Sequence, residues 1–462
     1  MKLRTLTAAV ALAALCTATS AFADDDMTLR RAAELAVNTN PEIMQAIQNR
    51  EAIAFEERQA RGLYLPRFWA EASAGVRELD NRSRRIAGID DHTLYPMEFS
   101  LNGEYTLYNF GGRRGELERQ AGRVDGAAHR VRERAEYIAL EASREYINYG
   151  LQEELVDLAR QNVAFHRDIV ARLQRGVSGR AVSETDLQQA RERLAAAERH
   201  LTEAERERTR AVISFRRIVG EPVTSYVSPE EYVSALPGSL DDALGMAREN
   251  NPEMHIQQAA ISAAEGELRT ARSEYMPEIT IEGRARTGED LDAIDGETND
   301  LQVRVVATWE FYNGGIYQAA EQEQLRRVSE ERFRLHQVAR EVEEDVRISW
   351  DRLESEQSLL SVLQEQTSLS TEVVGGYERQ WAGGRRSLLD LLDAQNSKIN
   401  VAEALATSEY AYLFAQYRLL ASTGDLLDNL GLTPPAAAEA NHRAAINAPD
   451  PGPGEDDRRR YP

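Results

Sequence analysis

Two aspartates have the clearest potential for chemistry in this sequence. Asp390 and Asp393 are three residues apart in a segment expected to be helical, so their carboxylates share one helix face in successive turns. Carboxylates gathered around an axis attract cations and bind multivalent ones. Carboxylates also suit the first turn of a helix, where the helix dipole stabilises negative charge. The sequence leaves both interpretations open.

Charged and aromatic side chains flank this region in two expected turns. Trp381, Arg385 and Arg386 precede the aspartates. Arg180 lies in the corresponding earlier turn, and Asp186, which matches Asp390 in the repeat, follows that turn. Glycines in both turns allow the chain to reverse direction. The arginines either dock the helical tip of another protein or simply solvate a hairpin, and the sequence favours neither interpretation.

Other chemistry finds no support in the sequence. Seven histidines occur without a close pair or metal-ligand spacing, and Cys16 is the only cysteine. Neither Gly-Gly turn is followed by a phosphate-loop lysine, and no nucleophile elbow is present. With 77 acidic and 55 basic residues, a nucleic-acid surface is not expected. We therefore predict no enzyme activity, no cofactor, no metal site and no nucleic-acid partner.

The N-terminus resembles a secretory signal. Lys2 and Arg4 precede an apolar run at 6–16, and Ala21-Phe22-Ala23 has the pattern of a cleavage site. We predict a signal peptide over 1–23 and a mature chain outside the cytoplasm. A single membrane anchor is the alternative, although the run is shorter than the roughly 20 residues of a spanning helix.

The chain contains an internal repeat. Residues 29–66 match 240–277 at a constant offset, and further matches follow in the same order. The series indicates a tandem duplication, with repeats at 24–238 and 239–432. Residues 433–462 are rich in Pro, Ala and Asp, and we predict a disordered tail there.

Each repeat has two segments in which apolar and polar residues alternate. The four expected strands cover about 67–77, 96–109, 278–287 and 301–312. The apolar face includes Met97, Phe99, Leu101, Ile279, Ile281, Val303 and Val305. Such alternation over about ten residues is typical of a transmembrane β-strand with one face to lipid. A half-buried sheet in a soluble domain produces the same pattern.

Two further features favour the membrane. Aromatic residues gather where the expected strands meet the expected helices, as in an interfacial girdle, and the connections 78–96 and 288–300 are long and polar. A sheet in lipid must close, and the smallest closed barrels need about eight strands. Because one chain has four, several chains must share one barrel.

The remaining segments predict very long helices. Residues 112–176 and 315–381 lack proline, and at ~1.5 Å per residue each helix would reach about 100 Å. Apolar residues follow steps of three and four from Leu151 to Leu173, which is coiled-coil spacing. Each long helix is expected to form a hairpin with the helix that follows it.

The duplicated order of these motifs resembles the TolC family of outer-membrane channel-tunnels. The resemblance rests on two Asn-Pro-Glu helix starts, two Gly-Gly turns and the tip Gly-Gly-Arg-Arg-Ser-Leu-Leu-Asp-Leu-Leu-Asp-Ala, and it covers about 27–432. It implies a mixed α and transmembrane β fold, with a homotrimer forming a twelve-stranded barrel and an α-helical periplasmic tunnel. It also implies an exit duct in the outer membrane, with an inner-membrane transporter and a periplasmic adaptor as partners.

The resemblance also assigns site residues. It implies that Asp390 and Asp393 form the pore constriction, six carboxylates in a trimer, and that Trp381 and Arg386 belong to the gate. Trp381 stands where the family has tyrosine, so it lacks the hydroxyl. Type I protein secretion and the efflux of small molecules or metals remain open. The alternative from the residues alone is a soluble periplasmic coiled-coil scaffold or adaptor.

Overall fold

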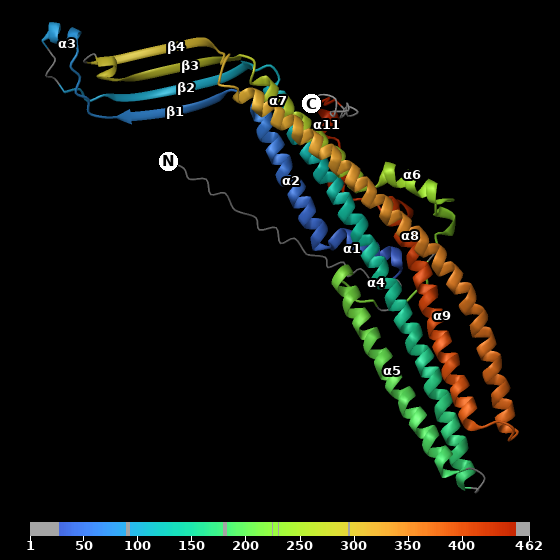
Figure 1. Ribbon diagram of the computed structural model, residues 1–462. Coiled ribbons are helices and arrows are strands. Elements are labelled where there is room, and N and C mark those ends of the chain that lie inside the picture. The colour runs from blue at the N-terminus through green and yellow to red at the C-terminus, as the bar shows by residue number, and fades with distance from the viewer. Residues whose placement is uncertain are drawn as a thin grey trace, which may run out of the picture.

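A computed structural model describes most of the chain, and it shows a four-stranded sheet continuing into a bundle of long helices (Figure 1). The described residues are 27–88, 93–178, 183–223, 225–229, 231–293 and 296–449. The predicted signal peptide at 1–23 lies outside them, as does Arg180. Among the described residues, no helix is both long and apolar enough to cross a bilayer.

The two halves of the chain contain the same elements. The first half has α1 (Leu29–Thr39), α2 (Pro41–Gly62), β1 (Arg67–Ala74), β2 (Met97–Tyr108), α4 (Gly112–Ser178) and α5 (Glu184–Val219). The second half has α6 (Leu240–Asn250), α7 (Pro252–Ser273), β3 (Glu278–Glu289), β4 (Glu297–Thr308), α8 (Ile316–Ala382) and α9 (Leu388–Thr423). Corresponding helices have equal lengths of 11, 22, 67 and 36 residues. The predicted tandem repeat of long helices and paired strands is therefore confirmed.

Asparagine caps begin α2 and α7, as the Asn-Pro-Glu motifs predict. The Asn40 side chain accepts a hydrogen bond from the Glu42 N–H at 2.9 Å, and Asn251 does the same for Glu253. Proline occupies the first helical position of each helix, where no amide donor is needed. Each cap also donates to the end of another helix, Asn40 to the Ile218 carbonyl of α5 and Asn251 to the Ser422 carbonyl of α9.

These contacts explain how the bundle is built. Helices α4 and α8 run its whole length, while α2 and α7 occupy the part near the sheet and α5 and α9 the part beyond (Figure 1). α4 contacts α2 and α7 at one level and α5 and α9 at the other, and α8 contacts α7 and α9. Thus α5 and α2 meet end to end beside α4, and so do α9 and α7.

The largest core lies at mid-length, where the short helix α1 covers α4. Tyr146, Phe215 and Tyr417 are fully buried there, and the Tyr146 hydroxyl donates to the Met27 carbonyl at 2.6 Å. A second core packs α6 against α8 and α9 around Val346. Both cores bury short helices of the middle region, so the long helices outside it depend on coiled-coil contacts.

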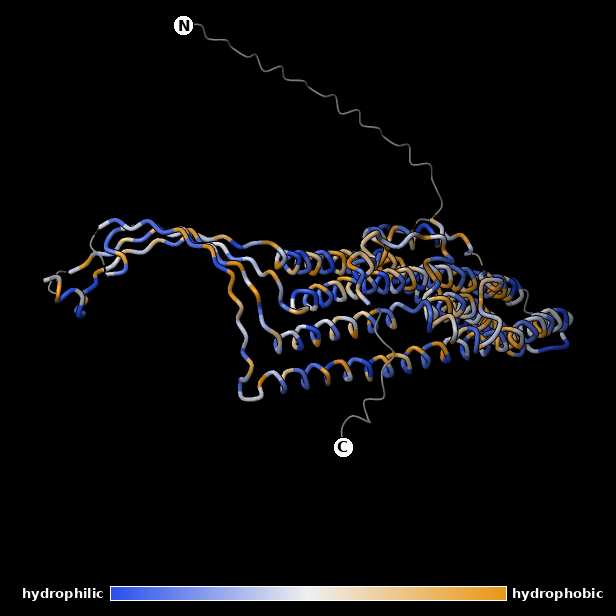
Figure 2. Tube along the Cα trace, turned by 90° about the horizontal axis from the view of Figure 1, so that it is seen from above, coloured by the Kyte–Doolittle hydropathy of each residue, from blue (hydrophilic) through white to orange (hydrophobic). Residues whose placement is uncertain are grey.

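The strands form one antiparallel sheet in the order β1-β2-β3-β4. Leu101 pairs with Ala285, which pairs in turn with Leu301, and Ile281 pairs with Val305. The apolar positions therefore share one face, on which Leu101, Leu301 and Val305 are exposed, Leu301 at 78%, while Ile281 is half-buried. Seen from above, the sheet extends past the helices, and hydropathy alternates along its strands (Figure 2).

The opposite face of the sheet is lined by ion pairs. Arg67 contacts Glu104 at 3.0 Å, and Arg304 contacts Glu282 at 2.6 Å. These residues occupy one row across the four strands, and a further pair joins Arg284 to Glu98. The sheet thus has one apolar face and one charged face.

Strand ends and loops differ from the predicted ones. β1 ends at Ala74 rather than 77, and β4 covers Glu297–Thr308 rather than 301–312. The connection predicted as a long loop at 288–300 is therefore shorter, because its polar ends belong to strands. The other connection, 78–96, contains the helix α3 (Arg82–Ala87). Of the added residues of β4, Thr298 and Asp300 lie on the charged face, and Asp300 pairs with Arg286 of β3 at 3.2 Å.

The prediction of a disordered tail from residue 433 is wrong for residues 433–449. This segment forms the turn η3 (Ala436–Ala438) and the short helix α11 (His442–Ala445). It lies against α4, where the Asp125 carboxylate accepts hydrogen bonds from the backbone N–H groups of His442 and Arg443 at 2.9 and 3.0 Å. Hydrogen bonds to the buried Asp125, which composition does not reveal, hold the segment on α4.

A buried histidine contact also joins this segment to α2. His442 Nδ1 lies 2.5 Å from a carboxylate oxygen of Glu57, and Arg50 donates to His442 Nε2 at 3.1 Å. His442 therefore joins the segment to two side chains of α2.

Candidate functional site at the hairpin tips

The free ends of the two helical hairpins form one packed unit. The α4–α5 and α8–α9 hairpins are held together by Ile169 and Leu173 of α4, Leu187 of α5, Val374 of α8 and Leu391 of α9, all of which are buried. Apolar side chains from four helices therefore fix the positions of the charged residues around them.

Asp390 and Asp393 lie outside this apolar cluster. The Ser387 side chain caps α9 by accepting a hydrogen bond from the Asp390 N–H at 3.1 Å, so Asp390 occupies the first turn. The helix-dipole interpretation therefore applies to Asp390, whereas Asp393 lies a turn later. The side chains of Asp390 and Asp393 are 45% and 60% exposed, because neighbouring Leu391 and Leu392 take the inward positions.

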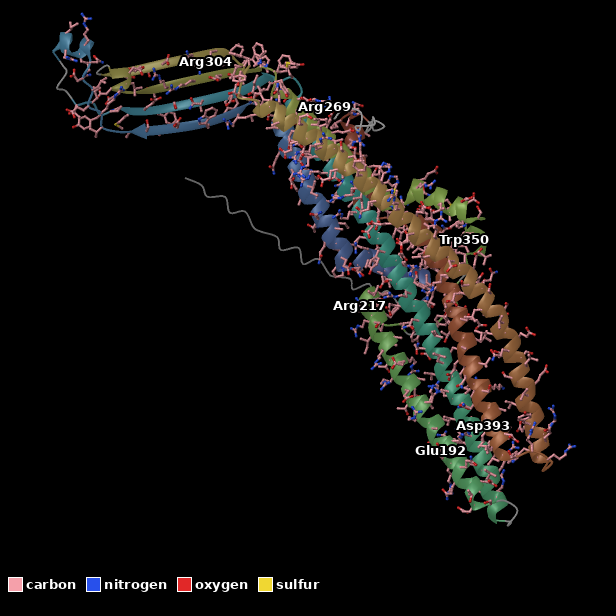
Figure 3. All side chains as sticks on the ribbon, in the orientation of Figure 1. Glu192, Arg217, Arg269, Arg304, Trp350 and Asp393 are labelled. Carbon is pink, nitrogen blue, oxygen red and sulfur yellow. The ribbon has the colours of Figure 1, made fainter. Side chains whose placement is uncertain are left out.

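Each aspartate has an arginine beside it. Arg386 lies 3.7 Å from Asp390, and Arg193 of α5 lies 3.5 Å from Asp393. Figure 3 shows Asp393 on α9 at this end of the bundle. Exposed ion pairs of this kind contribute about 0–1 kcal/mol, so they balance charge more than they stabilise. Arg193 is 200 positions from Asp393, and no motif predicted it.

The predicted gate residues have different surroundings in the structure. The Arg386 guanidinium lies over the ring of Tyr377, 4.0 Å from its centre, which is a cation–π contact. Trp381 is half-buried and packs against the apolar cluster. Arg385 is exposed in the turn, and Asp186 is half-buried in the first turn of α5.

Tyr377 is a site residue that sequence reasoning missed. It lies four positions before Trp381, so both rings project from one side of α8. The spacing of four residues was the signal that could have found it. Tyr377 supplies, one helical turn earlier, the hydroxyl that Trp381 lacks.

A buried polar layer joins the hairpins above the tips. Gln395 of α9 donates to Asn162 of α4 at 3.2 Å, and both side chains are buried. One turn away on α4, burial lowers the pKa of His166, and the nearby Arg193 adds to this effect. Buried polar pairs in coiled coils specify helix register, and here the pair aligns α9 with α4.

Comparison with known proteins settles the family. The family described as outer membrane efflux protein matches residues 32–221 and 243–425, one segment in each repeat. The chain belongs to the outer membrane efflux protein family. The predicted TolC-like, outer-membrane channel is thereby confirmed over the soluble scaffold or adaptor.

Relatives of this efflux-family chain include both efflux and secretion proteins. The outer membrane efflux protein BepC of Brucella suis is 24% identical over 307 residues, which are 65% of this chain and 66% of BepC. The alkaline protease secretion protein AprF of Pseudomonas aeruginosa is 23% identical over 403 residues, 83% of this chain and 82% of AprF. The identities are low, but they extend across both repeats.

The fold is that of a solved outer-membrane channel. The Campylobacter jejuni CmeC outer membrane channel superimposes with a TM-score of 0.75, at 16% identity, over 87% of this chain and 86% of CmeC. At this identity the likeness establishes the fold, a helical tunnel domain with a β domain.

Proposed function

We propose that three copies of this efflux-family chain form a passive exit duct. Their sheets would close into a twelve-stranded barrel through the outer membrane, and their helices into a periplasmic tunnel. An inner-membrane transporter and a periplasmic adaptor would supply and dock to the tunnel, and cargo choice would lie with the transporter. The observation that carries the proposal is the open sheet, with two unpaired edges and an uncovered apolar face.

The sheet supports closure among copies. Among the described strands, β1 pairs only with β2 and β4 only with β3, so each edge has unused donors and acceptors. Val303 and Val305 on the apolar face are 72% and 67% exposed. Lipid would cover that face, and neighbouring copies would pair the edges, since a bilayer cannot hydrogen-bond to them. Three sheets of four strands supply twelve.

The outer edge of α8 supports the same closure among the helices. Leu359, Val362, Leu369 and Val373 are 45–60% exposed, and they follow steps of three, seven and four. This is the seam of a coiled coil. Within the described chain the seam lies away from the buried face of α8 at Leu353, so a helix of a second copy would cover it.

The hairpin tips would form the gate of the duct. Three copies place Asp390 and Asp393 in carboxylate rings that favour cations, with Arg193 and Arg386 as charge partners. Tyr377 would hold Arg386 in place, and Trp381 would anchor the tip through packing. The exposed Arg385, together with Arg180 and Asp186, would complete the tip that faces the adaptor.

Single-channel recording tests the gate. We expect the double variant Asp390→Asn/Asp393→Asn to lose cation preference and to weaken block by a trivalent cation at least tenfold, since each trimer loses six charges. Arg193→Gln should strengthen the block severalfold, because Asp393 loses its partner. Asp168→Asn on α4 is the matched control. Unchanged selectivity and block in the double variant would refute the rings.

A further inference from the structure

A pocket lies at mid-length, where α9 ends and α7 begins. It has a volume of about 620 Å³, within the range of small-molecule sites, and side chains of α4, α7, α8 and α9 line it. Trp350, labelled in Figure 3, marks this level on α8. The proposed gate residues are far from this pocket, at the hairpin tips where α8 ends and α9 begins.

The charges of the pocket are divided between its two ends. Helices α4 and α8 both run from the sheet toward the hairpin tips (Figure 1). On α4 the lining residues Glu133 and Glu136 therefore lie toward the sheet, and Arg144 lies toward the tips. On α8, Asp345 likewise precedes Arg352. Carboxylates thus gather at the sheet end and guanidinium groups at the tip end, apart from Glu141, which lies beside Arg144.

The other two lining helices repeat this division. Glu253, at the start of α7, belongs to the carboxylate end, and Arg418 of α9 lies before Ser422, toward the tips. The seven residue steps from Asp345 to Arg352 span about 10 Å along the helix axis, at 1.5 Å for each step. The two charged ends are separated by a similar distance.

Several of these charges are not neutralised by neighbours. Glu141 is held by Arg144 at 2.6 Å, but no ion pair joins Glu253, Asp345, Arg352 or Arg418 to other described residues. Burial raises the pKa of Glu253, and the nearby carboxylates of the same end raise it further. The carboxylate end therefore has negative charge without an ion-pair partner, and the other end has positive charge without one; Glu253, Asp345 and Arg352 are exposed, so a solute can reach them.

Two buried polar atoms point to a missing partner. Glu136 is 4% exposed and Ser349 is 1% exposed, and both line the pocket. One Glu136 oxygen accepts from the Leu427 N–H at 3.2 Å, but Oε1 has no hydrogen-bond partner, and neither has the Ser349 hydroxyl. Buried polar atoms are nearly always paired, so the wall of the pocket has hydrogen-bonding capacity at these two positions that the described chain does not use.

The pocket lies on the uncovered side of the bundle. Helix α1 packs on α4 at Ala135, Ala139 and Tyr146, whereas the pocket uses the α4 residues on the opposite side. Apolar walls are supplied by Tyr137 and Phe414. A solute can therefore reach the pocket without displacing α1.

We propose that this pocket binds a small dipolar solute whose ammonium and carboxylate groups are about 10 Å apart, as in a short zwitterionic peptide. The ammonium group lies at the sheet end, between the carboxylates of Glu253 and Asp345. The carboxylate lies at the tip end, where Arg352 and Arg418 bind it. The apolar walls enclose the segment between them.

Calorimetric titration of the full chain in detergent with triglycine tests the site, since three extended residues span about 10 Å. We expect saturable binding, and at least tenfold weaker binding of triglycine amide, which lacks the carboxylate, and of N-acetyl-triglycine, which lacks the ammonium. Equal affinity for the three probes would overturn the proposal, and so would the absence of saturable triglycine binding.

Two variants identify the ends of the site. Arg352→Gln should remove the difference between triglycine and its amide, whereas Arg347→Gln, an exposed residue paired with Glu343 on the same helix, should keep it. Equal losses in both variants would also overturn the proposal. These titrations measure binding alone, so their failure leaves the duct to be judged by channel recording.

Discussion

Ionisation of Glu136 should make stability depend on pH in the neutral range. Its carboxyl is buried on α4 beside α10 (Leu426–Asn429), and burial raises its pKa from 4.5 to about 8. The N–H of Leu427 and the charge of Arg132 oppose this shift, and Asp428 adds to it. Between about pH 4.5 and pH 8 the folded chain therefore holds a proton that the unfolded chain releases. Stability falls as pH rises through this window.

Replacing Glu136 with Gln should abolish that fall, because the amide cannot ionise and still accepts from Leu427. We expect equal stability of parent and variant at pH 5, and a variant more stable by on the order of a few kcal/mol at pH 9. Thermal unfolding at both pH values measures this. Glu344→Gln, on an exposed part of α8, should retain the parental dependence, and an unchanged profile in Glu136→Gln would contradict the assignment.

Individual site residues were only partly predictable. Asp390 follows from the capping pattern of α9, since Ser387 lies three residues before it. Arg193 was not predictable, because its contact with Asp393 joins two hairpins far apart in sequence. Trp381 was assigned to the gate by position, but its bulk places it in the apolar cluster and leaves Tyr377 beside Arg386.

Within the sheet, adjacent residues face different surroundings. Val305 pairs with Ile281 on the apolar face, and Val306 pairs with Thr280 on the charged face. Val305→Arg should impair insertion and assembly, since arginine facing the lipid near the midplane costs roughly 2–4 kcal/mol. Val306→Arg is the matched control and should assemble. Outer-membrane fractionation of both variants measures this, and equal recovery would refute the facing assignment.

The segment 433–449 acts as a structural element rather than a tail. Deleting 433–462 removes the hydrogen bonds to Asp125 and the contact between His442 and Glu57. We expect a lower melting temperature and faster proteolysis near α2, because Glu57 would stay buried with fewer partners. Deleting 450–462 alone separates the contribution of the last residues. Equal melting of parent and the longer deletion would show that the segment adds no stability.

At the scale of the elements, the periodicity of apolar residues predicted which way the strand residues face better than it predicted where the strands begin and end. Alternation correctly assigned Val303 and Val305 to one face, because side chains in a strand alternate whatever the partner strand is. Alternation missed the start of β4, because the polar residue Asp300 there belongs to the strand through its ion pair with Arg286 of β3. Ion pairs across strands extend the sheet beyond its apolar residues.

For the whole molecule, the seam on α8 makes a prediction about assembly. Leu369→Arg should lower the fraction of trimer, because a charge would enter the proposed contact between copies, whereas Ser368→Arg is exposed but off the seam and should not. Native mass spectrometry in detergent measures the oligomer. Trimers of both variants in equal amounts would place the contact elsewhere.

The sequence by itself determined the duplicated plan, the long helices and the two-faced strands, because these depend on local spacing, caps and turns. Only the tertiary structure decided which distant residues meet: Arg193 with Asp393, His442 with Glu57, and the lining of the polarised pocket. The physical reason is that burial and charge pairing depend on distance in space. Helices of 67 residues bring together positions hundreds of residues apart that no local pattern connects.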